Sequence, residues 1–250
     1  MAQSAAWMPA LVKCETKGEI GMSDVKAPVL DRNVRMGLLI CGILSSLLWI
    51  GGDIFAAMLY QGYSYTSQAI SELTAIGAPT RSFLFGIIAI CQGLVIAFGL
   101  GVWLVDSSKF APRITAIMLI VSAIVQLLAL AGGPFFSMNL RGAEKTVSDT
   151  IHVIFGALTV LLMLLTVGFG AQIKGQRFKQ YSIMTILIIV LLGIWTGTDG
   201  ARIAANLPTP WMGIKERIFV YSFMLWVMVL AIVLLRTEQG QYKSSSTYRH

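Results

Sequence analysis

Long apolar stretches and short polar connectors alternate along the chain. The apolar stretches cover residues 36–60, 82–105, 114–136, 150–173, 181–198 and 214–235. A helix that crosses a bilayer needs about 20 apolar residues, and it pairs its backbone groups within itself, as hydrocarbon requires. The shorter alternating segments typical of a membrane barrel, about 10 residues each, do not occur in this pattern. The pattern therefore predicts an all-α integral membrane protein, a six-transmembrane-helix bundle.

The composition narrows the class further. Hydrophobic residues make up 56% of the 250 and charged residues 12%, whereas a soluble domain carries about 25% charged residues. The six stretches leave no length for a separate soluble domain. We expect one membrane domain over residues 32–236, preceded by a disordered cytoplasmic tail at 1–31 and followed by a cytoplasmic tail at 237–250. Met22 is an alternative start, because residues 1–21 show no periodicity.

Lysine and arginine are divided unevenly between the two sides that six spans define. Thirteen of the 19 lie before the first span, after the last span and in the second and fourth connectors, and six lie on the other side. Because basic residues favour the cytoplasmic side, we expect a multi-pass protein of the cell membrane with its N- and C-termini cytoplasmic. The 12 acids divide evenly, so the whole formal net charge of +7 falls on the cytoplasmic side.

This charge distribution also indicates the partners. A basic cytoplasmic face attracts anionic headgroups, so membrane lipids are the expected partners. We expect no nucleic acid, because no basic cluster with interleaved aromatic residues occurs in the chain.

Small residues recur at four-residue spacing in two of the predicted spans. Gly93, Ala97 and Gly101 form one such stripe, and Gly193 and Gly197 form another. Stripes of this kind let helix backbones approach closely in lipid. Two interpretations remain open: packing inside the bundle, or a homodimer through one of the stripes.

Polar residues gather around the end of the first span. Asp53 lies seven residues before Tyr60, which at a rise of about 1.5 Å per residue is roughly 10 Å deep, and an ionisable group at that depth is a candidate for function. On a short helix Ser67 and Ser71 would share a face, with Glu72 beside them. The alternatives are a buried ion pair for Asp53 and a capping role for the loop.

Asp149 and His152 open the fourth span. Their spacing places the carboxylate and the imidazole on one helix face, an arrangement that can orient a general base. Asp149 also lies where the helix dipole favours an anion. The pair is equally typical of a helix start with a hydrogen-bonded histidine.

Charged residues also flank the connector between the fifth and sixth spans. Asp199 and Arg202 have the spacing of a local ion pair. Glu216 and Arg217, at the start of a span, must face the bundle or reach outward. These residues form either an interhelical network at the rim or part of a polar pocket.

Several of these residues occur in a combination that resembles the six-span membrane family catalogued as domain of unknown function 998. The resemblance extends over about residues 36–235, and the most specific part is the run from Ile70 to Pro79. The matching residues are Gly52-Asp53, the Tyr60 and Tyr63 pair, Ile70-Ser-Glu-Leu73, Gly77-Ala-Pro79, His152, Gly213 and Glu216-Arg217. The resemblance implies a multi-pass membrane protein without an established activity.

Three functions remain open, and the sequence does not decide whether the protein is an enzyme. The first is a polar pocket on the extracytoplasmic face that binds or moves a lipid headgroup or a small polar solute. The second is a membrane-embedded lipid-modifying hydrolase, in which Asp149 and His152 supply acid/base chemistry and Ser71 or a water is the nucleophile. The third is a structural or accessory membrane subunit.

We expect no cofactor and no metal, because a haem held by two histidines or a zinc held by three needs more than His152 within the spans. The candidate ligand-binding residues are Asp53, Ser67, Ser71, Glu72, His152, Asp199, Arg202, Glu216 and Arg217.

Overall fold

The computed structural model describes residues 32–105 and 109–247, and most of them lie in helices. Six helices are long and apolar enough to cross a membrane. They are α1 (Arg32–Leu59), α2 (Arg81–Val105), α3 (Phe110–Gly132), α4 (Val147–Gly170), α5 (Gln176–Thr198) and α7 (Met212–Thr247). Three short elements, η1 (Ile70–Thr74), η2 (Gly133–Phe136) and α6 (Gly200–Ala204), lie in the connectors. Within the described ranges no strand occurs, so the prediction of an all-helical chain with six membrane-length helices is confirmed.

The first and last long helices extend beyond the predicted spans. α1 begins at Arg32 and α7 continues to Thr247. The extensions carry charged residues, and Arg35 and Glu238 form an ion pair of 2.9 Å between them. Charged side chains continue a helix without cost once it leaves hydrocarbon, so the apolar pattern alone does not show where these helices end. The expected tail at residues 1–31, with the alternative start at Met22, and residues 248–250 lie outside the described residues.

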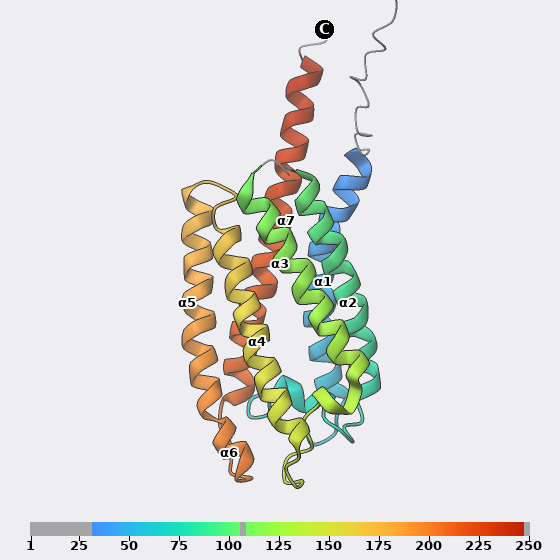
Figure 1. Ribbon diagram of the computed structural model, residues 1–250, viewed down its shortest axis with the longest axis vertical. Helices are drawn as coiled ribbons and strands as arrows, with labels where there is room; N and C mark the ends of the chain where they lie inside the picture. Colours follow the sequence, from blue (N-terminus) through green and yellow to red (C-terminus); the bar gives the residue numbers. More distant parts are fainter. Residues whose placement is uncertain (1–31, 106–108, 248–250) are drawn as a thin grey trace, which may run out of the picture. The chain divides into compact units, whose positions relative to one another are not determined.

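The long helices of residues 32–247 stand side by side (Figure 1), and their contacts close a ring. Each packs against the next in chain order, and α7 packs against both α5 and α1. The beginning of α1 and the end of α7 lie together, and we call this the terminal end (Figure 1). The opposite end carries three connectors, residues 60–80, 133–146 and 199–211, and we call it the loop end (Figure 1).

Helix α7 is the most buried of the six long helices. In its most apolar window 44% of the residues are buried, against 22% to 33% in the other five helices. Trp226 of α7 is fully buried and donates from Nε1 to the Ser182 hydroxyl of α5 at 2.9 Å. Gly170 of α4 leaves room for this indole, because a Cβ at that position would overlap it. The side chains of α7 therefore tie α4 and α5 to the rest of the ring.

The two stripes of small residues differ in what they contact. A Cβ at Gly101 would lie 3.0 Å from Leu38, so this glycine allows α2 to approach α1. Gly93, Gly193 and Gly197 have nothing within 4 Å of the same position. Packing inside the bundle thus accounts for Gly101, and a homodimer through the other glycines stays a prediction.

Candidate functional site

An arginine and an aspartate form a buried ion pair between α7 and α1. Arg217 donates from Nε to Asp53 Oδ2 at 2.8 Å and from Nη2 to Oδ1 at 3.0 Å. The two residues are 2% and 1% exposed. Nη1 donates to the backbone carbonyls of Tyr65 and Gly213, and the guanidinium carbon lies 3.7 Å from the centre of the Tyr65 ring. Every guanidinium nitrogen has a partner, which offsets the cost of burying the charge.

Three tyrosines surround this pair. Tyr221 donates to Asp53 Oδ2 and shares a hydrogen bond of 3.0 Å with the Tyr65 hydroxyl. Tyr63 accepts from Arg217 Nη2 at 2.9 Å and donates to loop carbonyls, the nearer at 2.8 Å. Burial raises the pKa of the Tyr63 phenol above its ordinary value, by more than Arg217 lowers it. Tyr63 therefore keeps the proton that it donates.

The first turn of α7 lies directly against the backbone of the connector 60–80. Gly213 makes this approach possible, because a Cβ there would overlap the carbonyl oxygens of Tyr65 and Gln68. One turn further on, Glu216 accepts the backbone N–H of Ile70 at 2.7 Å. Gly213, Glu216 and Arg217 thus fasten the connector to α7 together.

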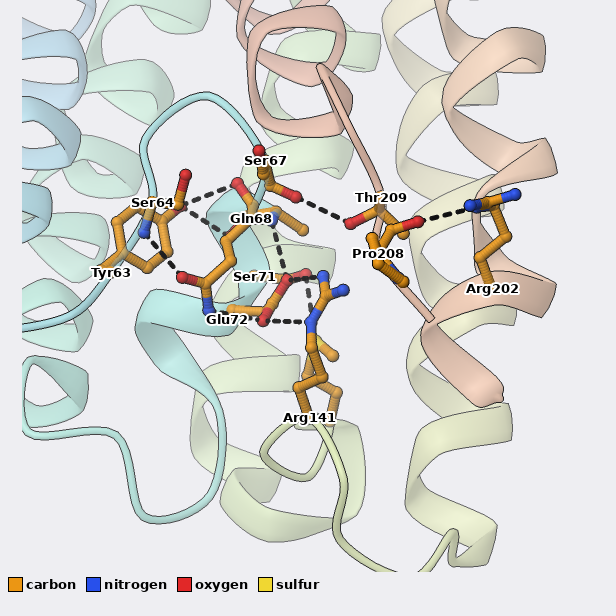
Figure 2. A network of polar contacts seen from close by, with 12 residues as sticks. Tyr63, Ser64, Ser67, Gln68, Ser71, Glu72, Arg141, Arg202, Pro208 and Thr209 are labelled. Atoms are coloured by element: carbon orange, nitrogen blue, oxygen red, sulfur yellow. Dashed lines mark hydrogen bonds and ion pairs between the residues drawn. The ribbon is translucent and has the colours of Figure 1, made fainter. Parts of the chain in front are cut away.

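Glu72 is the one acidic residue of this connector, and it is buried. It is 2% exposed and accepts the Ala69 backbone N–H and the Gln68 side-chain amide, each at 2.9 Å. Arg141 donates to both carboxylate oxygens, from Nη2 at 2.7 Å and from Nε at 3.2 Å (Figure 2). Nη1 of the same side chain reaches the Leu207 carbonyl at 3.3 Å. Arg141 therefore links all three connectors of the loop end.

Figure 2 shows a further link between two connectors and a contact within one. Thr209 donates to the Ser67 carbonyl at 2.8 Å and so links the connectors 199–211 and 60–80. Arg202 Nε donates to the Pro208 carbonyl at 2.8 Å inside the connector 199–211. Ser71 lies near the α3–α4 connector, where its hydroxyl donates to a methionine sulfur at 3.2 Å. Ser67 therefore binds Thr209 through its backbone carbonyl, not through its hydroxyl.

The local pair expected between Asp199 and Arg202 is replaced by a longer-range one. Asp199 forms its ion pair with Lys215 of α7, and both residues are buried. The Lys215 ammonium also lies 4.8 Å from the centre of the Trp195 ring. Because α5 ends at Thr198 and α6 begins two residues later, Asp199 lies at the junction and meets α7, while Arg202 is exposed.

Asp149 and His152 are engaged separately at the start of α4. The Asp149 carboxylate accepts the backbone N–H groups of Asn139 and Thr146, both at 2.8 Å, and the Asn139 side-chain amide at 2.7 Å. His152 Nδ1 lies 2.9 Å from the Phe136 carbonyl, so it carries the proton. The carboxylate caps its own helix and holds the preceding connector, while the imidazole holds η2.

A cavity of about 220 Å³ lies at the loop end, between the α3–α4 connector and residues 203–206. Two of the residues that bound it, Gly142 and Asn206, have φ of +85° and +53°, so left-handed turns shape both walls. The polar side chains that line it are Asn139, Arg141, Lys145, Asp149 and Asn206.

An apolar groove of about 370 Å³ lies against α1, lined by Ile54, Ala57, Met58 and Tyr65. Met58 is 77% exposed there. Because α1 is long and apolar enough to span a membrane, acyl chains would cover this face.

The structure brings some of the predicted residues together and separates others. Asp53, Ser67, Ser71, Glu72, Glu216 and Arg217 meet around the connector 60–80. Asp199 and Arg202 make other contacts, and so do Asp149 and His152. Lys145 and Asn206 line the cavity and carried no signal in the sequence, because single polar residues in a connector are unremarkable.

No metal cluster joins these groups, since among residues 32–105 and 109–247 no three His, Cys, Asp or Glu side chains are placed to hold an ion.

Six membrane-length helices, with buried ion pairs that tie helices and connectors together at one end, define a multi-pass α-helical membrane protein. The chain belongs to the family described as "Protein of unknown function (DUF998)", whose model matches residues 43–233. The matched range contains Asp53, Arg217 and the whole loop end. Comparison with curated proteins and with solved structures gave no match.

Proposed function

We propose that this protein binds a phosphate-bearing or zwitterionic group, from a lipid headgroup or a small polar solute, at the loop end. The observation that carries the proposal is the cavity of about 220 Å³ with Arg141 and Lys145 in its wall. Guanidinium and ammonium groups are the usual protein ligands of phosphate oxygens. Asn139 and Asn206 add amide groups to the same wall.

The local charges favour an anion in the cavity. The one carboxylate in its wall, Asp149, already accepts hydrogen bonds from Asn139 and Thr146. Lys145 is exposed, so its ammonium can turn toward a ligand. A negatively charged group therefore meets the Lys145 ammonium, the Arg141 guanidinium that Glu72 also binds, and an acid whose oxygens already accept hydrogen bonds.

The cavity also lies at the depth where lipid headgroups are found. Tryptophan and tyrosine are enriched at the boundary between hydrocarbon and water. At the loop end Trp195 and Trp211 are 59% and 66% exposed. The cavity belongs to the connectors at this end, so its ligand would sit among headgroups.

The orientation of the bundle is part of the proposal. The terminal end, which carries most of the lysines and arginines, lies in the cytoplasm, where it meets anionic headgroups. The loop end and its cavity then face the extracytoplasmic side. Ligands would reach the cavity from the outer leaflet or from the external solution.

Lys145→Gln tests the proposal, with Lys179→Gln as its matched control. Lys179 is also exposed but lies near the start of α5, at the terminal end. Binding of headgroup-labelled phosphatidylglycerol and of inorganic phosphate would be measured on the purified proteins. Loss of one charged hydrogen bond should weaken binding by about tenfold in Lys145→Gln, and Lys179→Gln should bind like the unmodified chain. Equal affinities in all three proteins would refute the proposal.

A further inference from the structure

One guanidinium serves both the cavity and the connector beside it. Arg141 lines the cavity, yet it also donates to both oxygens of Glu72. Its remaining nitrogen reaches the Leu207 carbonyl. The side chain is 20% exposed, whereas that of Glu72 is 2% exposed. Arg141 is therefore reachable from the cavity, and Glu72 is not.

We propose that a phosphate group in the cavity competes with Glu72 for Arg141, so that ligand binding loosens the connector 60–80. The inference rests on the proposed function and adds the regulation of the same site. Glu72 accepts two of the five guanidinium N–H groups and the Leu207 carbonyl accepts a third, so a phosphate in the cavity meets the two that remain on Nη1 and Nη2. The phosphate and Glu72 then share one positive charge and repel each other, so phosphate binding weakens the Glu72 contact.

The connector 60–80 can loosen locally because its other contacts are spread along the chain before Glu72. Glu72 keeps the Ala69 N–H and the Gln68 amide when Arg141 leaves. The contacts from Glu216 and Arg217 lie at residues 63–70, before Glu72 in the chain. Loss of Arg141 therefore loosens η1 and the link to Leu207, while the attachment to α7 remains. A buried carboxylate with fewer partners is unfavourable, and this opposes ligand binding.

The competition can be measured by changing Glu72 and following the affinity for the ligand, because coupled binding equilibria are reciprocal. If Glu72 and the ligand share Arg141, removal of the Glu72 charge must strengthen ligand binding. Glu72→Gln keeps the shape of the side chain and removes the charge. Coupling of the usual size corresponds to at least about a fivefold gain in affinity for phosphate.

Glu144→Gln is the matched control. Glu144 is an exposed acid in the same connector as Arg141, close in sequence to Lys145. The variant removes the same charge near the cavity, but Arg141 pairs with Glu72 and Leu207 and not with Glu144. A gain in Glu72→Gln that exceeds the gain in Glu144→Gln therefore reports the shared guanidinium, beyond a general change in electrostatic potential.

The binding assay has two ligand arms, inorganic phosphate and lipid nanodiscs that contain phosphatidic acid. A gain of fivefold or more in Glu72→Gln, absent in Glu144→Gln, supports the inference. The arm in which it occurs identifies free phosphate or a headgroup as the ligand source. If the unmodified chain binds and both variants gain equally or not at all, the inference is wrong and the proposed function stands. If no protein binds in either arm, the proposed function fails as well.

A second measurement does not depend on the folding of Glu72→Gln. Ser71→Cys, in a chain with Cys14 replaced by serine, places a thiol on η1 itself, beside Glu72. Phosphate should raise the rate at which a water-soluble maleimide labels this thiol. A rate that does not change at saturating phosphate overturns the inference.

Discussion

Two pairs of arginine and acid at the loop end have the same chemistry in different surroundings. In both, the guanidinium donates from Nε and Nη2 to the two oxygens of one carboxylate. The side chains of Arg217 and Asp53 are 3% and 1% exposed. Those of Arg141 and Glu72 are 20% and 2% exposed, and Arg141 borders a cavity.

The difference in exposure distinguishes an arginine whose charge only holds the fold together from one that a ligand can reach. Arg217 is enclosed by Asp53, two tyrosines and two backbone carbonyls, so a ligand would have to displace several contacts at once. Arg141 has one acid partner and one weak contact to a carbonyl. An ionisable group inside a membrane is a candidate for function by default, but here the deeper pair fastens the fold and the shallower one has room for a ligand.

Breaking the deeper pair should have the largest effect. We expect Arg217→Met to lower the free energy of unfolding by about 3–5 kcal/mol, because it leaves the Asp53 carboxylate buried without its counter-ion. The double variant Asp53→Leu with Arg217→Met should recover most of that loss, since no charge is then left unpaired. Thermal unfolding in detergent would measure both. Additive losses in the double variant would contradict the role of a paired charge.

Gly213→Ala sharpens the comparison without changing any charge. The added methyl group would overlap the carbonyl oxygens of Tyr65 and Gln68, so we expect a loss of about 1–3 kcal/mol from overpacking. Gly93→Ala is the control, because nothing lies within 4 Å of a Cβ there. The same unfolding assay applies, and equal stability of the two variants would show that the connector does not depend on this close approach.

The shallower pair should contribute least to stability. Arg141→Met should lower the free energy of unfolding by about 1–2 kcal/mol, because Glu72 keeps two hydrogen-bond donors and the lost contact is partly exposed. A loss as large as that of Arg217→Met would show that both pairs are equally structural. Measured together, the three single variants rank the two pairs and the glycine that lies beside the deeper one.

The sequence predicted the helices because hydrocarbon imposes length and apolarity on each span. It also marked Asp53 and Arg217 as unusual, since charge inside a span is costly, and it placed Glu72 beside Ser67 and Ser71 on a short helix. It did not show which groups meet. Arg217 and Asp53 are separated by 164 positions in the chain, and nothing in either segment names the other. The local spacing of Asp199 and Arg202 suggested the wrong partner, because Lys215 approaches through the packing of α5 on α7.

Backbone contacts were the other hidden part of the site. Gly213, Glu216 and Arg217 all bind or approach peptide groups of the connector 60–80. Every residue has a peptide group, so such contacts leave no trace in the identity of the residue that is bound. The cavity was equally invisible, because left-handed turns at Gly142 and Asn206 shape its walls.

The fastening of the connector 60–80 by α7 has a consequence for biogenesis. Asp53 and the connector are synthesised early, whereas Arg217 follows only after four further spans. During membrane insertion the carboxylate of Asp53 therefore has no counter-ion until α7 is inserted. Until then the connector 60–80 also lacks its contacts with α7. A nascent chain stalled before α7 would expose this polar segment, a feature by which membrane quality-control proteases could distinguish incomplete chains from finished ones.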